Sequence, residues 1–434
     1  MQARWPRKNG TASCIKHFAA NSQEERRMVT DSVMDERTLR EIYLTGFEIA
    51  VKEGKPHAIM SAYNMVNGKF ADENEHLLRE ILRDDWGFDG VVVSDWAGEV
   101  KRCPSRMPGS DIETPACRYG ADDIVKAVEE GRLDIRYVDE CVNRVLDLIE
   151  ITTKGEKGKP FDVEAHHDLA KRIADECVVL LKNDGILPLA PETRVALVGD
   201  FARKPRYQGA GSSIVNPTKL ECVLDDARVY PFKLIGFAEG FKRYGKKSAS
   251  DVKAAVELAK KADVTLFFAG LDEYSEAEGL DRQSLSVPAN QIETYRALKA
   301  AGLKVVVVLS CGSAVYMDWA QDADAIVYAG LTGQAGAASV LDVISGSVNP
   351  SGKLAETWSL PTSPCASESY FPGKEMTCEY REGPYIGYRY FDKAGKNVEY
   401  PFGFGLSYTT FEYSDISADE NGVTFTIKNT GSMA

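Results

Sequence analysis

Three short apolar runs in the first hundred residues each end in side chains that could take part in chemistry. These side chains are Lys16 and His17, Tyr63 and Asn64, and Asp95 and Trp96. In sheets built from repeated βα units, the carboxyl ends of the strands meet at one edge, and functional sites form there. A carboxylate at such an end can face a site while the valines before it fill the core. The three strand ends therefore predict one shared polar site.

Each of these side chains also has a purely structural interpretation. Asp95 could cap a following helix, and His17 could be a hydrogen-bonded core histidine. Tyr63 could serve packing only. Trp96 could belong to the core, although the apolar face of a sugar also stacks on such rings. Three polar strand ends in one series favour a site over these separate explanations.

A second candidate segment is GLDEYSEAEGLDRQSLSVP, residues 270–288, in which five carboxylates crowd into ten positions beside Arg282. The five are Asp272, Glu273, Glu276, Glu278 and Asp281. A charge run usually indicates a solvated loop. The functional alternative is a loop that offers one carboxylic acid to a site, because nearby like charges raise a carboxyl pKa and suit it to general-acid work.

Carboxylates on two separate segments fit glycoside hydrolysis. One carboxylate attacks or stabilises the anomeric carbon while the other protonates the leaving oxygen, and a retaining enzyme holds them roughly 5–5.5 Å apart. This reaction needs no cofactor. The nine cysteines include no CxxC pair, so we expect no zinc site.

The composition indicates a globular chain of two or three domains: 434 residues, 44% of them hydrophobic and 27% charged. A net charge of −13 argues against a nucleic-acid partner and gives no reason to expect an anionic membrane surface. No apolar run approaches the roughly 20 residues of a spanning helix. Scattered, odd-numbered cysteines and an N-terminus without an apolar signal region favour a cytoplasmic location.

The elements that must position these residues follow from periodicity. Up to about residue 150, strands at 14–18, 58–63 and 91–95 alternate with helical patterns, which predicts a parallel sheet in a barrel or an open sheet. Asp35 and Asn74 are placed to start two of the helices, and an apolar stripe marks a last one.

Further along the chain, a polar stretch with Gly and Pro predicts a linker, and a second α/β region follows it. Buried strands are expected at 195–199, 264–269, 305–309 and 325–328, with helices at 251–261 and 291–301. From residue 403, alternating apolar and polar residues predict antiparallel strands. Barely two such strands precede Ala434, so the sequence reads as cut inside a domain.

Eight stretches resemble, in order, the motifs of glycoside hydrolase family 3, especially its β-glucosidases. They are KHFAANSQEERR, IMSAYNMVNG, GFDGVVVSDW, LLKNDGILPL, RYQGAGSSIVNP, EAEGLDRQSLSVP, NPSGKLAETW and YPFGFGLSYTTFEYS. The resemblance implies an α/β fold with the C-terminal part of a (β/α)8-type barrel, an α/β sandwich and the start of a fibronectin type III-like domain. We expect the barrel part at 1–151, a linker at 152–168, the sandwich at 169–402 and the incomplete β domain at 403–434.

The resemblance also implies residue roles. Asp95, in the SDW motif, is similar to the family's nucleophile. The general acid/base resembles the Glu before the Gly of EGLDR, here Glu278, with Glu276 as the second candidate.

The substrate-binding residues implied by the resemblance come from the barrel part. Lys16 and His17 match a KH pair that hydrogen-bonds sugar hydroxyls. Tyr63 matches a tyrosine beside the nucleophile, and Trp96 would line the sugar subsite.

The sequence departs from the family pattern in three places, one of which is its end just inside the fibronectin-like domain. The KH motif starts at residue 16, so the upstream strands that usually bring an acidic residue and an arginine to the sugar are absent. About four barrel strands remain where closure takes eight, which predicts open strand edges. Such edges would be covered by a homo-oligomer through the incomplete barrel or by another chain, or would lead to aggregation. After SDW the chain reads AGEVKRCPSRMPGSDIETP, in which Asp111 and Glu113 match the family's DxE.

We therefore expect a retaining glycosidase that cleaves terminal β-D-glucosyl residues from β-glucosides or short β-linked oligosaccharides, without metal or organic cofactor. The alternative is a catalytically impaired carbohydrate-binding or structural remnant of such an enzyme. A nucleotide-binding oxidoreductase, suggested by VALVGD and GAGSS, fits poorly because a glycine-rich loop should follow its strand directly.

Overall fold

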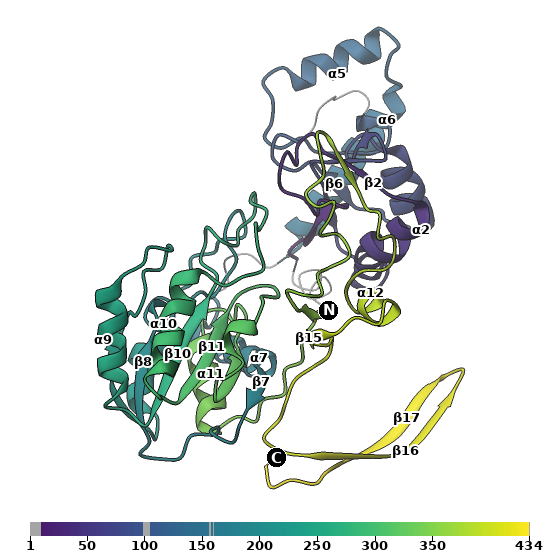
Figure 1. The fold of residues 1–434 in the computed structure, drawn as a ribbon. Helices are drawn as coiled ribbons and strands as arrows, with labels where there is room; N and C mark the ends of the chain where they lie inside the picture. Colours follow the sequence, from purple (N-terminus) through teal and green to yellow (C-terminus); the bar gives the residue numbers. More distant parts are fainter. Residues whose placement is uncertain (1–9, 99–104, 156–157, 159, 434) are drawn as a thin grey trace. The chain divides into compact units, whose positions relative to one another are not determined.

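The computed structural model describes residues 10–98, 105–155, 158 and 160–433 (Figure 1). The chain forms two compact units. The first comprises Met1–Pro160 and Ala366–Ile386, and the second comprises Phe161–Cys365 and Gly387–Ala434. Among the described residues, no helix combines the length and the apolar character needed to cross a bilayer.

A parallel sheet forms the centre of the first unit. Its strands β1 (Cys14–Phe18), β3 (Ala58–Ser61) and β6 (Val91–Val93) are hydrogen-bonded in the order β1-β3-β6. A parallel bridge between Val93 and Ile112 adds a fourth segment beside β6. This arrangement confirms the predicted series of parallel strands and the mixed α/β fold class.

Helices start where the sequence placed their caps. The Asp35 side chain accepts a hydrogen bond from the Thr38 backbone N–H at 2.8 Å, and the Asn74 side chain accepts one from that of Leu77 at 3.2 Å. The first cap opens a continuous helical run of α2 (Glu36–Thr38), η1 (Leu39–Leu44), α3 (Thr45–Ile49) and η2 (Ala50–Gly54). The second precedes η3 (His76–Asp85), whose apolar face is buried in the core of the unit.

The first unit also contains a segment that returns from far along the chain. Strand β14 (Thr377–Glu379) pairs in parallel with β2 (Asp31–Val33), in a small sheet completed by β4 (Met65–Val66) and β5 (Lys69–Phe70). We call Ala366–Ile386 the returning segment. It lies within the range 169–402 that the sequence suggested for the sandwich, and its single three-residue strand gave no periodic signal of this return. The predicted domain boundaries stay predictions, because a compact unit and a family domain are different divisions of a chain.

Two helices, α5 (Gly120–Glu129) and α6 (Ile135–Thr153), complete the first unit. The apolar stripe predicted on α6 is present, but Ile135, Val142 and Ile149 are each about half exposed. In this helix Cys141 is the buried side chain. The stripe is therefore only partly covered within the described part of the unit.

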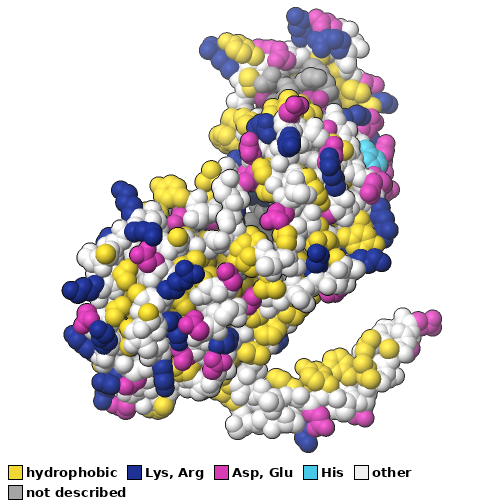
Figure 2. Space-filling model, in the orientation of Figure 1, with side chains coloured by type: hydrophobic (Ala, Val, Ile, Leu, Met, Phe, Trp, Pro, Cys, Tyr) yellow, Lys and Arg dark blue, Asp and Glu magenta, His cyan; other side chains and the backbone are white. Residues whose placement is uncertain are grey.

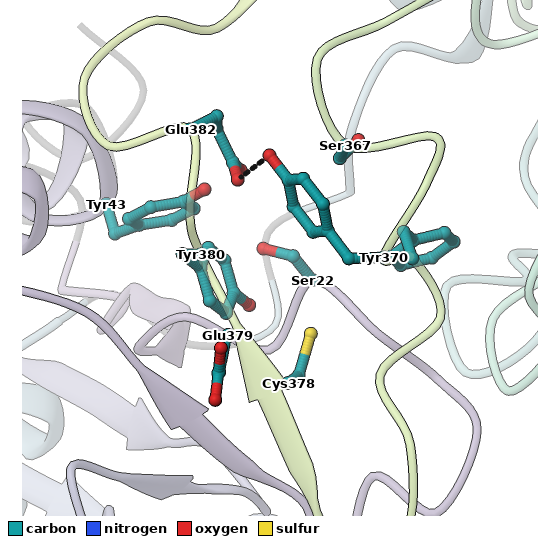
Figure 3. Close-up of a pocket in the computed structure, with 9 residues that line it drawn as sticks. Ser22, Tyr43, Ser367, Tyr370, Cys378, Glu379, Tyr380 and Glu382 are labelled. Carbon is teal, nitrogen blue, oxygen red and sulfur yellow. Dashed lines mark hydrogen bonds between the residues drawn. The ribbon is translucent and has the colours of Figure 1, made fainter.

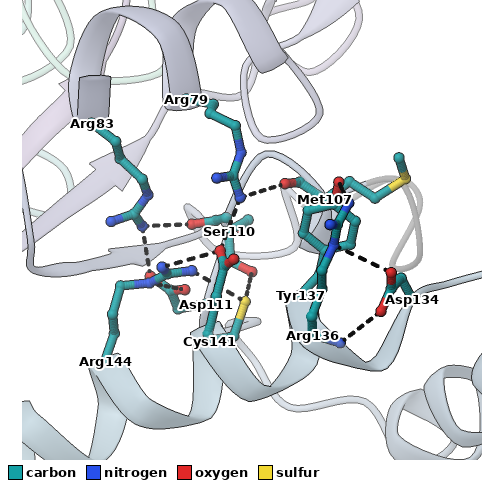
Figure 4. A network of polar contacts seen from close by, with 12 residues as sticks. Arg79, Arg83, Met107, Ser110, Asp111, Asp134, Arg136, Tyr137, Cys141 and Arg144 are labelled. Atoms are coloured by element: carbon teal, nitrogen blue, oxygen red, sulfur yellow. Dashed lines mark hydrogen bonds and ion pairs between the residues drawn. The ribbon is translucent and has the colours of Figure 1, made fainter. Parts of the chain in front are cut away.

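A buried carboxylate fixes the segment that follows β6 (Figure 4). The side chain of Asp111 is fully buried and lies 3.1 Å from the guanidinium of Arg83 and 2.9 Å from that of Arg144. It also accepts a hydrogen bond from the Val92 backbone N–H at 2.7 Å. The Arg83 side chain is 9% exposed, and this burial lowers the pKa of its guanidinium. Asp111, which the resemblance placed in a DxE motif, thus holds strand, loop and α6 together.

Replacing Asp111 with Asn should lower the free energy of unfolding by about 3–5 kcal/mol, because Arg83 and Arg144 would both lose the charge of their buried partner. Urea unfolding followed by circular dichroism measures this change. The matched control is Asp85→Asn, which breaks a pair with Arg40 at 2.8 Å between side chains that are about one-third and one-half exposed. We expect the control to cost about 0–1 kcal/mol. Equal effects of the two substitutions would contradict the structural role of Asp111.

The second unit is built on a six-stranded sheet in the order β7-β12-β11-β10-β8-β9. All neighbours pair in parallel except β7, which is antiparallel to β12. Figure 1 shows the helices α7, α9, α10 and α11 beside this sheet. The strands are β7 (Val179–Asn183), β8 (Arg194–Val198), β9 (Lys233–Ala238), β10 (Val264–Gly270), β11 (Val305–Ser310) and β12 (Ala325–Tyr328). The helices are α7 (Val163–Cys177), η4 (Asp200–Ala202), α8 (Val223–Asp226), η5 (Ala227–Val229), α9 (Ala249–Ala259), α10 (Ala289–Ala300), η6 (Asp318–Ala320) and α11 (Gly336–Ser345).

The strand order reverses at β8. The chain continues from β8 to β9 on one side of it, and then crosses to β10 on the other side. In open parallel sheets the chain leaves such a switch point in opposite directions, and ligand sites form at the carboxyl ends of the strands there. The segments that follow β8 and β10, residues 199–222 and 271–288, therefore start at neighbouring positions on one edge of the sheet.

The C-terminal part of the second unit contains short elements and one long hairpin. Strands β13 (Trp358–Ser359) and β15 (Val398–Tyr400) pair with each other, with α12 (Gly387–Lys393) between them in the chain. The hairpin of β16 (Phe411–Asp419) and β17 (Gly422–Asn429) confirms the predicted antiparallel strands. Its apolar residues, seen as a yellow band in Figure 2, remain exposed.

Candidate functional site

Two of the predicted site residues meet at the carboxyl edge of the first unit's parallel sheet. The imidazole Nε2 of His17 lies 3.3 Å from Oδ2 of Asp95. Because β1 and β6 flank β3 in a parallel sheet, side chains at their carboxyl ends are brought to one edge. The Asp95 residue is only 8% exposed, so its carboxylate is held largely out of bulk water.

A tight turn fixes the Asp95 carboxylate. Its Oδ1 accepts a hydrogen bond from the Trp96 backbone N–H at 2.6 Å, and Ala97 adopts a left-handed φ of 64°. The Ala97 N–H donates to the carbonyl of Thr114 at 2.6 Å, which ties the turn to the segment after Ile112. In the described residues Asp95 thus opens a turn, whereas the alternative interpretation placed it at the cap of a helix.

Tyr63, two residues after the end of β3, contacts this turn. Its hydroxyl donates to the carbonyl of Trp96 at 2.9 Å. This hydrogen bond holds the backbone next to Asp95 and does not involve the Asp95 carboxylate. The Tyr63 ring is buried, whereas Trp96 is 65% exposed and Lys16 is exposed next to His17. The arrangement is a buried carboxylate followed in the chain by an exposed indole, with an exposed ammonium group next to His17.

Sequence reasoning missed Arg27 as a member of this group. Its guanidinium lies over the Tyr63 ring, 4.7 Å from the ring centroid, and its Nη1 is 3.0 Å from a carboxylate oxygen of Glu24. Arg27 belongs to the same KHFAANSQEERR stretch as His17, but no periodicity links a loop residue to a ring 36 positions away. The returning segment helps to hold this loop, since the Gly373 N–H donates to the Gln23 side chain at 2.6 Å.

Glu278 lies in the loop after β10 in the second unit, against the loop after β8. Its Oε2 accepts hydrogen bonds from the backbone N–H of Ser212 at 2.7 Å and from the Ser212 hydroxyl at 2.5 Å. The Glu278 N–H donates to the Ala210 carbonyl at 3.0 Å. Gly211, with φ +108°, is required between them, because a Cβ there would lie 2.5 Å from Cβ of Glu278. The switch point of the sheet thus brings the two loops together.

Glu276, the second acid/base candidate, is bound differently. Its Oε2 accepts from the Gly312 N–H at 2.8 Å and its Oε1 from the Ser313 hydroxyl at 3.0 Å. The guanidinium of Arg206, a buried residue, lies 4.0 Å away. Both carboxylate oxygens are therefore used to fasten the loop to the turn after β11, which favours Glu278 as the residue that acts on a ligand.

Other acids of this loop also have structural roles. Arg243 binds both oxygens of Glu273, at 3.1 and 2.7 Å. Burial opposes ionisation of Glu273, but the hydrogen bonds from Arg243 hold its pKa below the usual range. Asp272 is buried and accepts from the backbone N–H groups of Tyr274 and Ser275, both at 2.9 Å. Local pairing therefore accounts for most of this acidic run. Within the described residues, His, Cys, Asp and Glu side chains form no group of three or more that could hold a metal ion.

Comparison with known families gives two matches that together cover most of the chain. Residues 2–148 match the glycosyl hydrolase family 3 N-terminal domain, and residues 178–408 match the glycosyl hydrolase family 3 C-terminal domain. The chain belongs to glycosyl hydrolase family 3.

Several relatives are similar over almost the whole chain. Thermostable beta-glucosidase B of Acetivibrio thermocellus and an exo-alpha-(1->6)-L-arabinopyranosidase of Bifidobacterium longum are each 42% identical to it, over 98% of the chain and 58% of their own length. The crystal structure of the Bifidobacterium adolescentis GH3 beta-glucosidase superposes with a TM-score of 0.92 at 42% identity, over 98% of this chain and 64% of that one. Beta-glucosidase 3B from Thermotoga neapolitana gives a TM-score of 0.89 at 34% identity, over 99% and 66%. The chain thus spans about three-fifths of the length of these curated relatives.

Proposed function

We propose that the chain is the part of a retaining glycoside hydrolase that carries the nucleophile and the general acid/base, acting on terminal β-D-glucosyl residues. The observation that carries the proposal is the Asp95 carboxylate, buried at a strand end, fixed by the Trp96 N–H and lying 3.3 Å from His17. Family membership and relatives named beta-glucosidase support this activity.

The proposed reaction has two displacements at the anomeric carbon. In the first, an Asp95 oxygen forms a bond to that carbon while the bond to the aglycone oxygen breaks, and Glu278 gives its proton to the leaving oxygen. In the second, Glu278 takes a proton from water, the water oxygen attacks the same carbon and Asp95 is released. The mechanism requires the two carboxyl groups to approach to roughly 5–5.5 Å across the sugar.

The remaining residues bind and orient the sugar in this proposal. Lys16 and His17 hydrogen-bond ring hydroxyls, and Trp96 offers an exposed indole face to the apolar side of the ring. Tyr63 keeps the Asp95 turn in place through the Trp96 carbonyl. Arg27 adds a cation over Tyr63 that can donate to a hydroxyl.

Covalent trapping tests the proposal directly. A 2,4-dinitrophenyl 2-deoxy-2-fluoro-β-D-glucoside should leave a 2-fluoroglucosyl group on the chain. Fluorine slows both displacements, but the good leaving group keeps the first one fast enough for the covalent intermediate to accumulate. Peptide mass spectrometry should find the ester on Asp95. The Asp95→Asn chain should stay unlabelled, and a label on another residue or on none would rule out the proposed nucleophile. Absence of any label together with sugar binding would favour the impaired, carbohydrate-binding remnant.

The sugar preference is tested with a panel of 4-nitrophenyl glycosides. Relatives of equal identity bear the names of a beta-glucosidase and an exo-alpha-(1->6)-L-arabinopyranosidase, so both sugars belong in the panel. We expect the β-D-glucoside to give the highest kcat/KM. A higher kcat/KM for the α-L-arabinopyranoside would contradict the proposed glucoside preference and would be compatible with the proposed two-step mechanism.

A further inference from the structure

A cavity of about 260 Å³ lies within the first unit, between the loop after β1, helix η1 and the returning segment (Figure 3). The walls used below are Ser22, Tyr43, Tyr370, Phe371, Tyr380 and Glu382. The first-unit residues implicated above in sugar hydrolysis do not line it; they are Lys16, His17, Arg27, Tyr63, Asp95 and Trp96. The cavity is therefore a different place from the site around Asp95.

Polar groups converge on this cavity. Figure 3 shows the hydroxyls of Tyr43 and Ser22 and the carboxylate of Glu382 directed toward its middle. The Tyr370 hydroxyl donates to Oε2 of Glu382 at 2.8 Å, which orients the carboxylate. Within the described residues, the Tyr43 hydroxyl and the other oxygen of Glu382, Oε1, make no hydrogen bond. These two groups are thus placed to bind something that enters.

Burial raises the pKa of Tyr43, with the nearby Tyr380 and Glu382 adding to the effect, so its hydroxyl stays a neutral donor. The cavity therefore offers a hydroxyl donor from Tyr43 and an oriented carboxylate acceptor from Glu382.

The apolar walls are rigid. The rings of Tyr43 and Tyr380 pack edge to face, with centroids 4.8 Å apart. The Tyr380 hydroxyl donates to the Ala20 carbonyl at 2.9 Å, which fixes that ring to the loop after β1. Phe371 adds a further ring surface. A preformed cavity of this kind binds without first having to order its walls.

The chemistry of the walls selects a class of ligand. Ring surfaces suit the C–H face of a sugar, and a carboxylate can accept from two adjacent hydroxyls while tyrosine and serine hydroxyls donate to others. The described lining contains no lysine or arginine, so an anion would find no counter-charge there. The volume lies below the roughly 300–1,000 Å³ of drug-sized pockets, which suits one ring rather than a chain of rings.

We propose that this cavity is a second carbohydrate site, which binds a single pyranose sugar through Glu382 and Tyr43 independently of the site at Asp95. The inference goes beyond the proposed hydrolase function, because it requires no chemistry at Asp95.

Saturation-transfer difference NMR with D-glucose tests the inference. The background is a His17→Ala/Trp96→Ala chain, in which the site at Asp95 is disabled. Glucose should still receive saturation there, and Glu382→Gln or Tyr43→Phe should weaken its binding by about tenfold or more, as expected for the loss of a hydrogen bond to a buried group. The matched control is Glu368→Gln, because Glu368 is an exposed carboxylate of the same returning segment that does not line the cavity.

Each outcome decides the question. Unchanged binding in both cavity variants, or no binding of glucose in the background chain, would overturn the proposal. Binding of choline in place of glucose would overturn the ligand class and point to a cation site. Unfolding of Glu382→Gln, seen as a lowered Tm, leaves Tyr43→Phe to decide, since it removes one oxygen atom only. Failure of the hydrolase proposal has a different signature, namely no fluoroglucosyl label on Asp95.

Discussion

Replacing Asp95 with Asn should lower the rate of 4-nitrophenol release from 4-nitrophenyl β-D-glucoside by roughly 10⁴- to 10⁶-fold, the loss typical of a catalytic nucleophile. Asn has the size of Asp and can still accept from the Trp96 N–H, which is 2.6 Å from Oδ1. It cannot form a glycosyl ester that water hydrolyses. The effect should therefore appear in kcat with little change in KM.

A matched control separates chemistry from folding. Asp89 is an exposed carboxylate just before β6, at the opposite end of the strand from Asp95. The rate of Asp89→Asn should stay within about threefold of the wild-type rate. A surface substitution of this kind changes the free energy of unfolding by less than about 0.5 kcal/mol. Initial rates, with circular dichroism of both variants, give the comparison. An Asp95→Asn chain that keeps a tenth of the activity would exclude a nucleophilic role.

Replacing Glu278 with Ala should produce a rate loss that depends on the leaving group. We expect about 10²- to 10⁴-fold for methyl β-D-glucoside, whose alkoxide needs a proton as it departs. The 2,4-dinitrophenyl glucoside should show a much smaller loss in its first step, because dinitrophenolate leaves without protonation. A plot of log kcat/KM against leaving-group pKa for wild type and variant measures this difference in slope.

Glu276→Gln is the matched control for that experiment. Its carboxylate is held by the Gly312 N–H and the Ser313 hydroxyl, so its loss should lower stability and leave the slope unchanged. Azide should restore part of the activity of Glu278→Ala by attacking the glycosyl ester in the space left by the side chain, giving β-glucosyl azide. A steeper slope in Glu276→Gln, with a normal one in Glu278→Ala, would exchange the two assignments.

Local signals explain why so much of the fold could be predicted. The valine run before Asp95 is buried and forms β6, and Asp35 and Asn74 make the cap hydrogen bonds that their residue types suggested. The parallel order of β1, β3 and β6 then brings the strand ends to one edge. Strand periodicity and helix caps act over a few residues, so one sequence is enough to find them.

The contacts that escaped prediction join residues far apart in the chain. Arg27 stacks on Tyr63, and Cys378 and Tyr380 enter the core of the first unit. The acidic loop 271–288 looked like one cluster of like charges, but Arg243 and the turn after β11 pair with its members separately. Such partners are selected by tertiary packing, for which a single sequence carries no local periodic signal.

The returning segment has a consequence for how the chain is made. During synthesis the N-terminal strands leave the ribosome first, yet β14, which pairs with β2, is made only after the six-stranded sheet of the second unit. Domains usually mature in the order of translation. Here β2 must wait with one edge unpaired until residue 379 has been added, so the first unit can complete its fold only after the strands of the six-stranded sheet have been made.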